Sequence, residues 1–332
     1  MIDCIFTIDY EIYGNGDGSL HDLVFLPTRK LINIFEKHGQ RYVVFVEAAE
    51  LEMIESVGSD TGIDAVRDQL RYLDKHGYEL GLHIHPGWYN AKYDNAKNHW
   101  NIDYNDYNLS AFPEERIVQI LERAVSYMKK ILSNDTFLPV SFRSGHLLFQ
   151  PSRNLAHALS KLGVKVDSSL YKGGTWHQQN QDYRKACKNA FYWRFKNDIN
   201  IPDSDGILLE LPIYTEMVPI WKMLTSKRVG LQGLGSSVKQ TSKKLFSRVK
   251  DYMRYSHPLK FDIGQMTSEE ILKMMSGIIQ IDNKDPSSYK PIVIIGHTKE
   301  LTDLAQIEAL LFYLKRYSIP VSTLDDAYRK CL

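Results

Sequence analysis

The sequence contains few cysteines, and they form no recognisable motif. Only three occur in 332 residues, they are far apart, and no Cys-x-x-Cys pair is present among Cys4, Cys187 and Cys331. An odd number at this spacing argues against a disulfide framework and against a thiolate metal site. A reducing compartment is therefore the expected environment.

Long apolar runs and an excess of one charge are also missing. No stretch approaches about 18 uninterrupted apolar residues, and no signal peptide precedes the first predicted strand. Lys and Arg number 41 against 40 for Asp and Glu, so the net charge of +1 gives no reason to expect nucleic-acid binding. We expect a cytoplasmic protein that is either free or peripheral to a membrane.

The chain does contain the material for a full hydrophobic core. Its composition, 43% hydrophobic and 24% charged, is typical of a globular protein, and its length allows one large α/β domain. Apolar strands alternate with amphipathic helices, and a loop or helix opens at Glu47. The predicted strands are 2–8, 42–46, 79–84, 138–142, 164–166, 207–211, 292–295 and 320–323, and the predicted helices are 27–38, 60–76, 113–132, 155–162, 266–282, 303–317 and 324–331.

This alternation favours parallel strands joined by crossover helices. Polar or titratable residues follow six of the predicted strands, at the edge where parallel α/β folds build their sites. A single site that draws on the first, third, fourth, fifth and seventh strands fits a barrel better than an open sheet. We therefore predict an α/β fold, a distorted (β/α)7-8 barrel that residues 1–332 form as one domain.

Two segments depart from the alternation. Residues 88–112 are rich in Tyr, Trp, Asn and Asp, a mixture that suits sugar rings but would also suit a packed surface excursion. Residues 221–260 carry Lys or Arg at ten positions and an acid only at Asp251. This basic insertion is either a solvated helical segment or an arm that contacts an anionic partner, such as a sugar nucleotide, an acidic glycan or a membrane surface.

Two pairs of metal-binding side chains stand at strand ends. His83 and His85 are two residues apart at the end of the strand 79–84, so they lie on the same face of it. Neutral imidazole is a common zinc ligand, which makes the pair a candidate metal site, with a hydrogen-bonded pair as the alternative. Asp9 and Glu11 repeat this geometry at the end of the first strand, which favours the metal hypothesis.

Five strand-end motifs occur in the order that one enzyme family uses. Over residues 2 to about 327 the chain resembles the polysaccharide deacetylase (NodB-homology, carbohydrate esterase family four) superfamily, in a divergent branch whose second motif is His-x-His-Pro. The closing segment Val321–Leu324 is similar to the last strand of that family. The motifs that carry the resemblance are Thr7–Glu11, Glu79–His83, Phe142–Gly145, Asp167–Ser169 and Gly296–His297.

The resemblance implies a distorted barrel of metal-dependent enzymes that remove acetyl groups from N-acetylated, sometimes O-acetylated, sugars. It implies that Asp9 is the general base, that Arg143 orients this base, and that His297 is the general acid. The family's first motif continues with a metal-binding aspartate. Tyr10 occupies that position here, so we assign the ligand role to Glu11, which shares a strand face with Asp9.

The same resemblance guides the remaining assignments. The family's second motif has histidines four residues apart, a position held here by Gly87, so the metal role passes to His83 and His85. Two imidazoles and one carboxylate with an open position favour Zn²⁺, with Co²⁺ or Ni²⁺ as alternatives. Contacts with the substrate are predicted for Trp88, Tyr10, His146 and Asp167.

Each role also has a purely structural alternative. Arg143 could be the ion-pair partner of an interior acid, and His297 could cap a strand end. Asp167 could position a loop, and His146 could simply pack against its neighbours.

The predicted function is a metal-dependent deacetylase that hydrolyses the N-acetyl group of a sugar or glycan precursor during polysaccharide biosynthesis. One alternative is a non-catalytic carbohydrate-binding barrel, which the loss of the adjacent aspartate pair supports. Another is a different metal-dependent hydrolase, although such enzymes usually carry His-x-His on the first strand.

Overall fold

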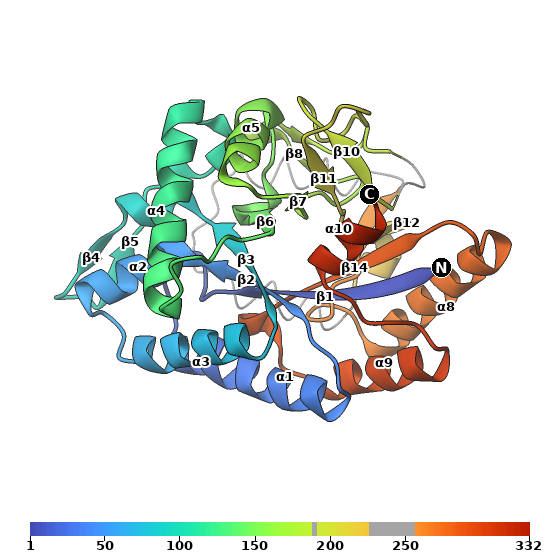
Figure 1. The fold of residues 1–332 in the computed structure, drawn as a ribbon. Helices are drawn as coiled ribbons and strands as arrows, with labels where there is room; N and C mark the ends of the chain where they lie inside the picture. The colour runs from blue at the N-terminus through green and yellow to red at the C-terminus, as the bar shows by residue number, and fades with distance from the viewer. Residues whose placement is uncertain (188–190, 226–255) are drawn as a thin grey trace.

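The computed structural model describes residues 1–187, 191–225 and 256–332. Its largest element is an eight-stranded sheet that curls into part of a barrel and carries helices on its outer side (Figure 1). In sheet order the strands are β10 (Trp193–Phe195), β11 (Leu208–Glu210), β7 (Val166–Asp167), β6 (Ser141–Ser144), β3 (Glu79–Ile84), β2 (Val43–Glu47), β1 (Ile2–Tyr10) and β14 (Lys290–His297).

Parallel pairing runs from β14 to β11, and only the edge strand β10 pairs antiparallel. Ile213, three residues after β11, forms parallel bridges with Tyr171 on one side and with Val293 of β14 on the other. These bridges bring the two ends of the curled sheet together. The predicted distorted barrel is therefore confirmed.

The helices lie where the sequence predicts them, with ends that differ by a few residues. The segment that opens at Glu47, for which the sequence allows a loop or a helix, is helical. The helices are α1 (Leu26–Lys37), α2 (Ala48–Val57), α3 (Ile63–Lys75), α4 (Glu114–Leu132), α5 (Ser152–Leu162), α8 (Ser268–Lys284), α9 (Ala305–Arg316) and α10 (Leu324–Lys330).

Two strand predictions need correction. The segment 320–323 forms only an isolated bridge between Val321 and Cys4, because α10 begins immediately afterwards. The eighth strand is instead β10, which lies between the predicted strands 164–166 and 207–211. Trp193 and Phe195 alternate there with the less buried Arg194, which is the period-two pattern of a half-buried strand.

The two faces of β1 belong to different parts of the core. Phe6, Ile8 and Tyr10 point outward and pack in the layer between sheet and helices. Ile5 points inward and joins a second cluster inside the barrel, which Leu324 of α10 closes at one end. Because side chains alternate along a strand, Asp9 must also point inward while Tyr10 points toward the helices. This alternation decides which side chains can enter a site.

Short hairpins decorate the barrel. The segment 88–112 contains β4 (Lys92–Asp94) and β5 (His99–Asn101), and the hairpin of β8 (Thr175–Trp176) and β9 (Gln181–Asp182) lies farther along the chain. The strand β12 (Thr215–Val218) precedes the basic insertion and pairs with β13 (His257–Lys260), which forms the end of the insertion. Most of the insertion, residues 226–255, lies outside the described residues.

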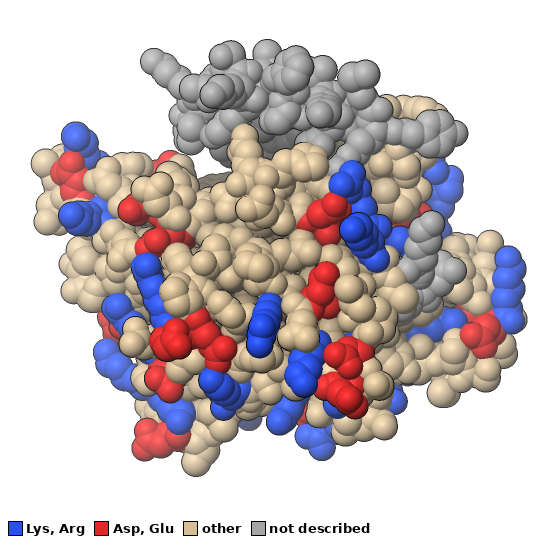
Figure 2. All heavy atoms as spheres, turned by 90° about the horizontal axis from the view of Figure 1, so that it is seen from above, with Lys and Arg blue, Asp and Glu red and all other residues tan. Residues whose placement is uncertain are grey.

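Two further properties concern the surface and the membrane. Seen from above, acidic and basic side chains are interspersed over the described part of that face (Figure 2), in keeping with the net charge of +1. None of the helices in the described part of the chain combines the length and the apolar content that crossing a membrane requires.

Gly81 in β3 offers a direct test of how tightly the inner face is packed. A Cβ atom at this position would lie 2.6 Å from the Phe45 ring and 2.7 Å from Oγ of Ser141. We expect Gly81→Ala to lower the free energy of unfolding by about 1–3 kcal/mol, measured by urea denaturation, because the surrounding side chains must move.

Gly277→Ala in α8 is the matched control, since its Cβ would meet Glu216 at an ordinary 3.6 Å. In a helix interior this change should be neutral or stabilising by up to about 1 kcal/mol. Equal stability of the two variants would contradict the tight packing of Phe45 against β3.

Candidate active site

The titratable side chains that follow the parallel strands meet at one cavity of about 380 Å³. The ends of β1, β3 and β14 contribute directly to its wall, as expected for the carboxyl ends of parallel strands in one barrel. Its charged, histidine and amide lining residues are Asp9, Glu11, His83, His85, His146, Lys260, Gln265, His297, Lys299 and Glu300.

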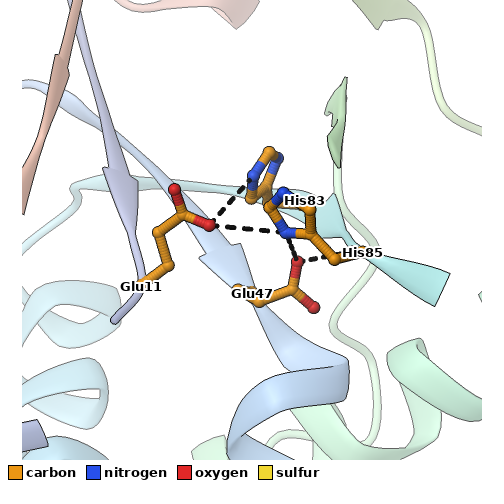
Figure 3. A group of neighbouring side chains, drawn as sticks. All are labelled: Glu11, Glu47, His83 and His85. Carbon is orange, nitrogen blue, oxygen red and sulfur yellow. Dashed lines mark hydrogen bonds and ion pairs between the residues drawn. The ribbon is translucent and has the colours of Figure 1, made fainter. Parts of the chain in front are cut away.

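Two carboxylates and two imidazoles form a buried group beside this cavity (Figure 3), and all of them except Glu47 line it. Oε2 of Glu11 lies 3.5 Å from Nε2 of His83 and 3.4 Å from Nδ1 of His85, and Oε2 of Glu47 lies 2.7 Å from the same Nδ1. One ligand atom from each residue lies within 4.8 Å of all the others. Such a cluster can hold a divalent ion, and it unites all three predicted ligands.

The imidazole of His83 is fixed by its backbone surroundings. Its Nδ1 lies 2.8 Å from the carbonyl oxygen of Arg143, so the ring donates its proton there and directs Nε2 toward Glu11. A hydrogen bond at one ring nitrogen is the usual device that sets the tautomer of a metal-binding histidine. The bond therefore prepares His83 to offer a lone pair to an ion.

Glu47 is the cluster member that the sequence reasoning missed. It ends β2, and its Oε1 accepts hydrogen bonds from the backbone N–H groups of Ala49 and Glu50, which caps α2. Its Oε2 accepts from the backbone N–H of His85 at 2.6 Å. The available signal was the same as for Asp9, an acid directly after a predicted apolar strand.

Asp9 and Arg143 form a fully buried ion pair beside the cluster. Nη1 of Arg143 donates to Oδ1 of Asp9 at 2.7 Å, and its Nη2 donates to Oγ1 of Thr7 at 2.8 Å. Burial would raise the pKa of Asp9, but the positive charges of Arg143 and His83 outweigh burial and hold this pKa below its usual value. Asp9 is therefore ionised at neutral pH.

His297 stands between acidic groups on both sides of its ring. Its Nε2 lies 3.4 Å from Oδ2 of Asp9, and its Nδ1 lies 3.5 Å from Oε2 of Glu300. Asp262, which follows β13, lies near His297 and Glu300. Sequence reasoning missed both Glu300 and Asp262, and Asp262 carried no signal because it follows a strand that was not predicted.

His146 lines the cavity as predicted, although its role stays a prediction. Its ring stacks on Tyr107 with centroids 3.8 Å apart, and the Tyr107 hydroxyl is 3.2 Å from Nδ1 of His146. Burial and the nearby His85 lower the pKa of His146 well below its ordinary value, so this ring is neutral. Trp176 packs edge-on against Tyr107 and also borders the cavity.

Tyr10 and Trp88 do not contact the cavity in the way that was predicted. Tyr10 is 0% exposed, points toward the helix layer and donates its hydroxyl hydrogen to Gln69. Trp88 is 1% exposed and packs edge-on against Trp100, with ring centroids 5.2 Å apart. Neither side chain lines this cavity, although Trp88 borders a smaller one beside His85 and His146, so substrate contact by either residue stays a prediction.

Asp167 is also buried and does not line this cavity, so its contact with a substrate stays a prediction. Its carboxylate accepts hydrogen bonds from the hydroxyl and backbone N–H of Ser169, and it is buried beside Glu210. Burial raises the pKa of Asp167 to about 6. Burial and the negative charge of Asp167 together raise the pKa of Glu210 well above its usual value. The two acids lie behind Arg143, where they support the site without entering it.

Comparison with known proteins places this geometry in a familiar fold. No protein-family model and no curated protein sequence matches the chain. Among solved structures, a putative polysaccharide deacetylase from Mycobacterium smegmatis is similar over 99% of this chain and 89% of its own, with 12% sequence identity and a TM-score of 0.55. The chain therefore has a fold of the polysaccharide deacetylase type.

Enzymes with other names share this fold. A 4-alpha-glucanotransferase from Thermococcus litoralis is similar over all of this chain but only 38% of its own, with 14% identity and a TM-score of 0.52. A GH57-type branching enzyme from Pyrococcus horikoshii is similar over 98% of this chain and 69% of its own, with 12% identity and a TM-score of 0.52. The fold alone does not select a reaction.

The charge of His83 makes metal binding dependent on pH. Burial opposes protonation of this ring, but the carboxylates of Asp9 and Glu11 outweigh burial and raise its pKa to about 9 in the absence of a metal. A metal ion requires the neutral ring, so at pH 7 each ion bound should release about one proton. Its affinity should rise roughly tenfold per pH unit between pH 6.5 and 8.5.

Calorimetric titration of Zn²⁺ or Co²⁺ in buffers of different ionisation enthalpy measures this proton release. His83→Gln serves as the comparison and should bind more weakly with less proton release. Absence of proton release from the wild-type protein at pH 7 would show that His83 is already neutral.

Proposed function

We propose that this protein is a metal-dependent deacetylase that hydrolyses the N-acetyl group of a sugar or glycan precursor. The observation that carries the proposal is that Glu11, His83 and His85 of the cluster line one cavity with Asp9 and His297, while Glu47 and Arg143 support them from behind. The deacetylase-type fold supports it.

The residues fit a divalent transition metal. Two imidazole nitrogens with carboxylate oxygens match the preference of Zn²⁺, with Co²⁺ and Ni²⁺ as close alternatives, better than the all-oxygen preference of Mg²⁺ or Ca²⁺. Glu11, His83 and His85 would hold the ion, and Glu47 would act as a further ligand or as the hydrogen-bond partner of His85. When bound, such an ion supplies Lewis acidity toward the amide carbonyl and the attacking water.

The chain's own residues supply the proton transfers. Asp9, kept ionised by Arg143, accepts a proton from the water as the water oxygen bonds to the acyl carbon. His297, whose Nε2 lies 3.4 Å from Oδ2 of Asp9, then donates a proton to the sugar nitrogen as the carbon–nitrogen bond breaks. The products are acetate and a free amine.

Acetate release tests the proposal directly. The purified protein, supplied with Zn²⁺, Co²⁺ or Ni²⁺, is assayed on a panel of N-acetylated sugar nucleotides and oligosaccharides. We expect His83→Ala and His85→Ala to lose both stoichiometric metal and activity. Asp9→Asn should keep the metal and lose turnover by about 10²-fold or more, because only the base is removed.

The control is His99→Ala, which changes an exposed histidine away from the cavity. This variant should keep both its metal content and its rate of acetate release. A wild-type protein that binds no stoichiometric metal and releases no acetate would instead favour a non-catalytic carbohydrate-binding barrel. Metal-dependent hydrolysis of other substrates without acetate release would favour a different hydrolase.

The pH dependence of activity tests the role of Arg143. Removing the guanidinium in Arg143→Gln deprives Asp9 of its strongest stabilising charge, so the pKa of Asp9 should rise. The acidic limb of the kcat/KM profile should then move to higher pH by about one unit or more, because the base must be ionised. Arg143→Lys, which keeps the charge, should move the limb less.

Both Arg143 variants need a thermal unfolding measurement, since the side chain is fully buried. A folded Arg143→Gln protein with lower kcat and an unshifted acidic limb would mean that Arg143 only maintains the structure.

A further inference from the structure

Lys299 is a buried cation at the cavity wall that the proposed mechanism does not use. It lies in the turn η8 (Thr298–Glu300), two residues after His297, and its side chain is 12% exposed. Its ammonium is 2.7 Å from Oε1 of Glu11 and 3.0 Å from the carbonyl oxygen of Ile12. Burying a lysine this deeply is unfavourable unless its charge is matched or used.

The turn that carries Lys299 is anchored to the end of β1. The hydroxyl of Thr298 donates to the carbonyl oxygen of Glu11 at 3.2 Å, and the Glu11 backbone N–H points back at the same hydroxyl. The position of the ammonium is therefore fixed by the anchored backbone of the turn and by the two hydrogen bonds of the ammonium itself. Groups fixed before the reaction stabilise developing charge without a reorganisation cost.

The carboxylate of Glu11 separates Lys299 from the two imidazoles. Oε1 faces the ammonium, while Oε2 faces His83 and His85. The positive charge thus touches one proposed metal ligand, Glu11, and lies one carboxylate group away from the two imidazoles, and it borders the same cavity as Asp9 and His297. Two of its three N–H groups bond to described residues, which leaves one donor for a ligand.

We propose that Lys299 is a catalytic residue that donates its remaining hydrogen bond to the acyl oxygen of the substrate, where negative charge develops as water adds. This inference rests on the proposed function. In the product complex the same donor binds an oxygen of acetate. A permanent cation at the wall of a cavity with a low dielectric constant stabilises an oxyanion effectively.

The competing role is that of a counter-ion only. In that case Lys299 merely neutralises Glu11, and its loss would weaken the folded protein or the metal site without a separate effect on the acyl group. The two roles differ in their effect on anion binding when the metal site remains loaded. Loss of Lys299 weakens acetate binding only if Lys299 is the hydrogen-bond donor to the anion.

Acetate binding to the metal-loaded protein distinguishes them, measured by calorimetry without any turnover. We expect Lys299→Met to bind acetate at least about 10-fold more weakly while metal stoichiometry is retained, and to lower kcat by about 10²-fold on any N-acetylated substrate the wild type accepts. Lys299→Gln keeps a donor toward Glu11 without the charge and should show the same loss, so the test stands even if the methionine variant fails to fold.

Lys260→Met is the matched control, because Lys260 borders the same cavity but places its ammonium over the ring of Tyr171 at 5.2 Å. It should change acetate affinity by less than about twofold. Wild-type acetate affinity in a folded, metal-loaded Lys299→Gln protein would overturn the proposal, as would a loss of kcat that simply follows a loss of metal.

The two proposals can fail separately. If the wild-type protein releases no acetate from the panel, the proposed function fails, yet the acetate-binding comparison still decides whether Lys299 is the anion donor of this cavity. If the wild type is active and Lys299→Gln matches it in kcat and acetate affinity, only the role of Lys299 is refuted.

Discussion

The guanidinium of Arg143 is the interaction on which the rest of the site depends. It is fully buried and bonds to Asp9 and Thr7 of β1 and to the carbonyl oxygen of Ser168 after β7, and it lies over the Phe45 ring of β2 at 4.3 Å. The carbonyl oxygen of the same residue orients His83 on β3. Arg143 on β6 thus contacts β1, β2 and the end of β7 through its side chain and β3 through its backbone carbonyl. Because its charge cannot be removed at any physiological pH, the surrounding carboxylates must supply its partner.

The site concentrates carboxylates that burial would otherwise destabilise, and each has its own compensation. Asp9 is paired with Arg143, Glu11 with Lys299, and Glu47 caps the start of α2. Glu50 forms no ion pair with any residue in the described part of the chain. Burial, with the charges of Glu11 and Glu47, raises its pKa well above the usual value, so it stays neutral and accepts a hydrogen bond from Ile12. The folded site is therefore stable before any ion is bound, and ion binding need only displace a proton from His83.

Much of the site could be predicted because strand alternation carries exact positional information. Asp9, Glu11, His83 and His85 were found together since period two fixes the face of each side chain. The same rule, applied to Tyr10 between Asp9 and Glu11, already excluded it from the cavity. Aromatic composition could not separate the buried Trp88 from an exposed sugar contact, because both look alike in sequence. Glu300, Asp262 and Lys299 were missed because they depend on turns and on pairing between distant segments, which local patterns do not encode.

The replacement of one ligand has consequences for charge that connect Glu47 with Lys299. Position 10 points toward the helices, whereas Glu11 places its carboxylate on the inner face and near Glu47, so the cluster carries two acidic groups. A divalent ion held by both would be fully neutralised and would attract an electron-rich acyl oxygen less strongly. Lys299, bonded to Glu11 at 2.7 Å, restores one positive charge at that point. Glu47 and Lys299, neither of which the sequence reasoning found, thus bring charges of opposite sign to the surroundings of His85 and Glu11.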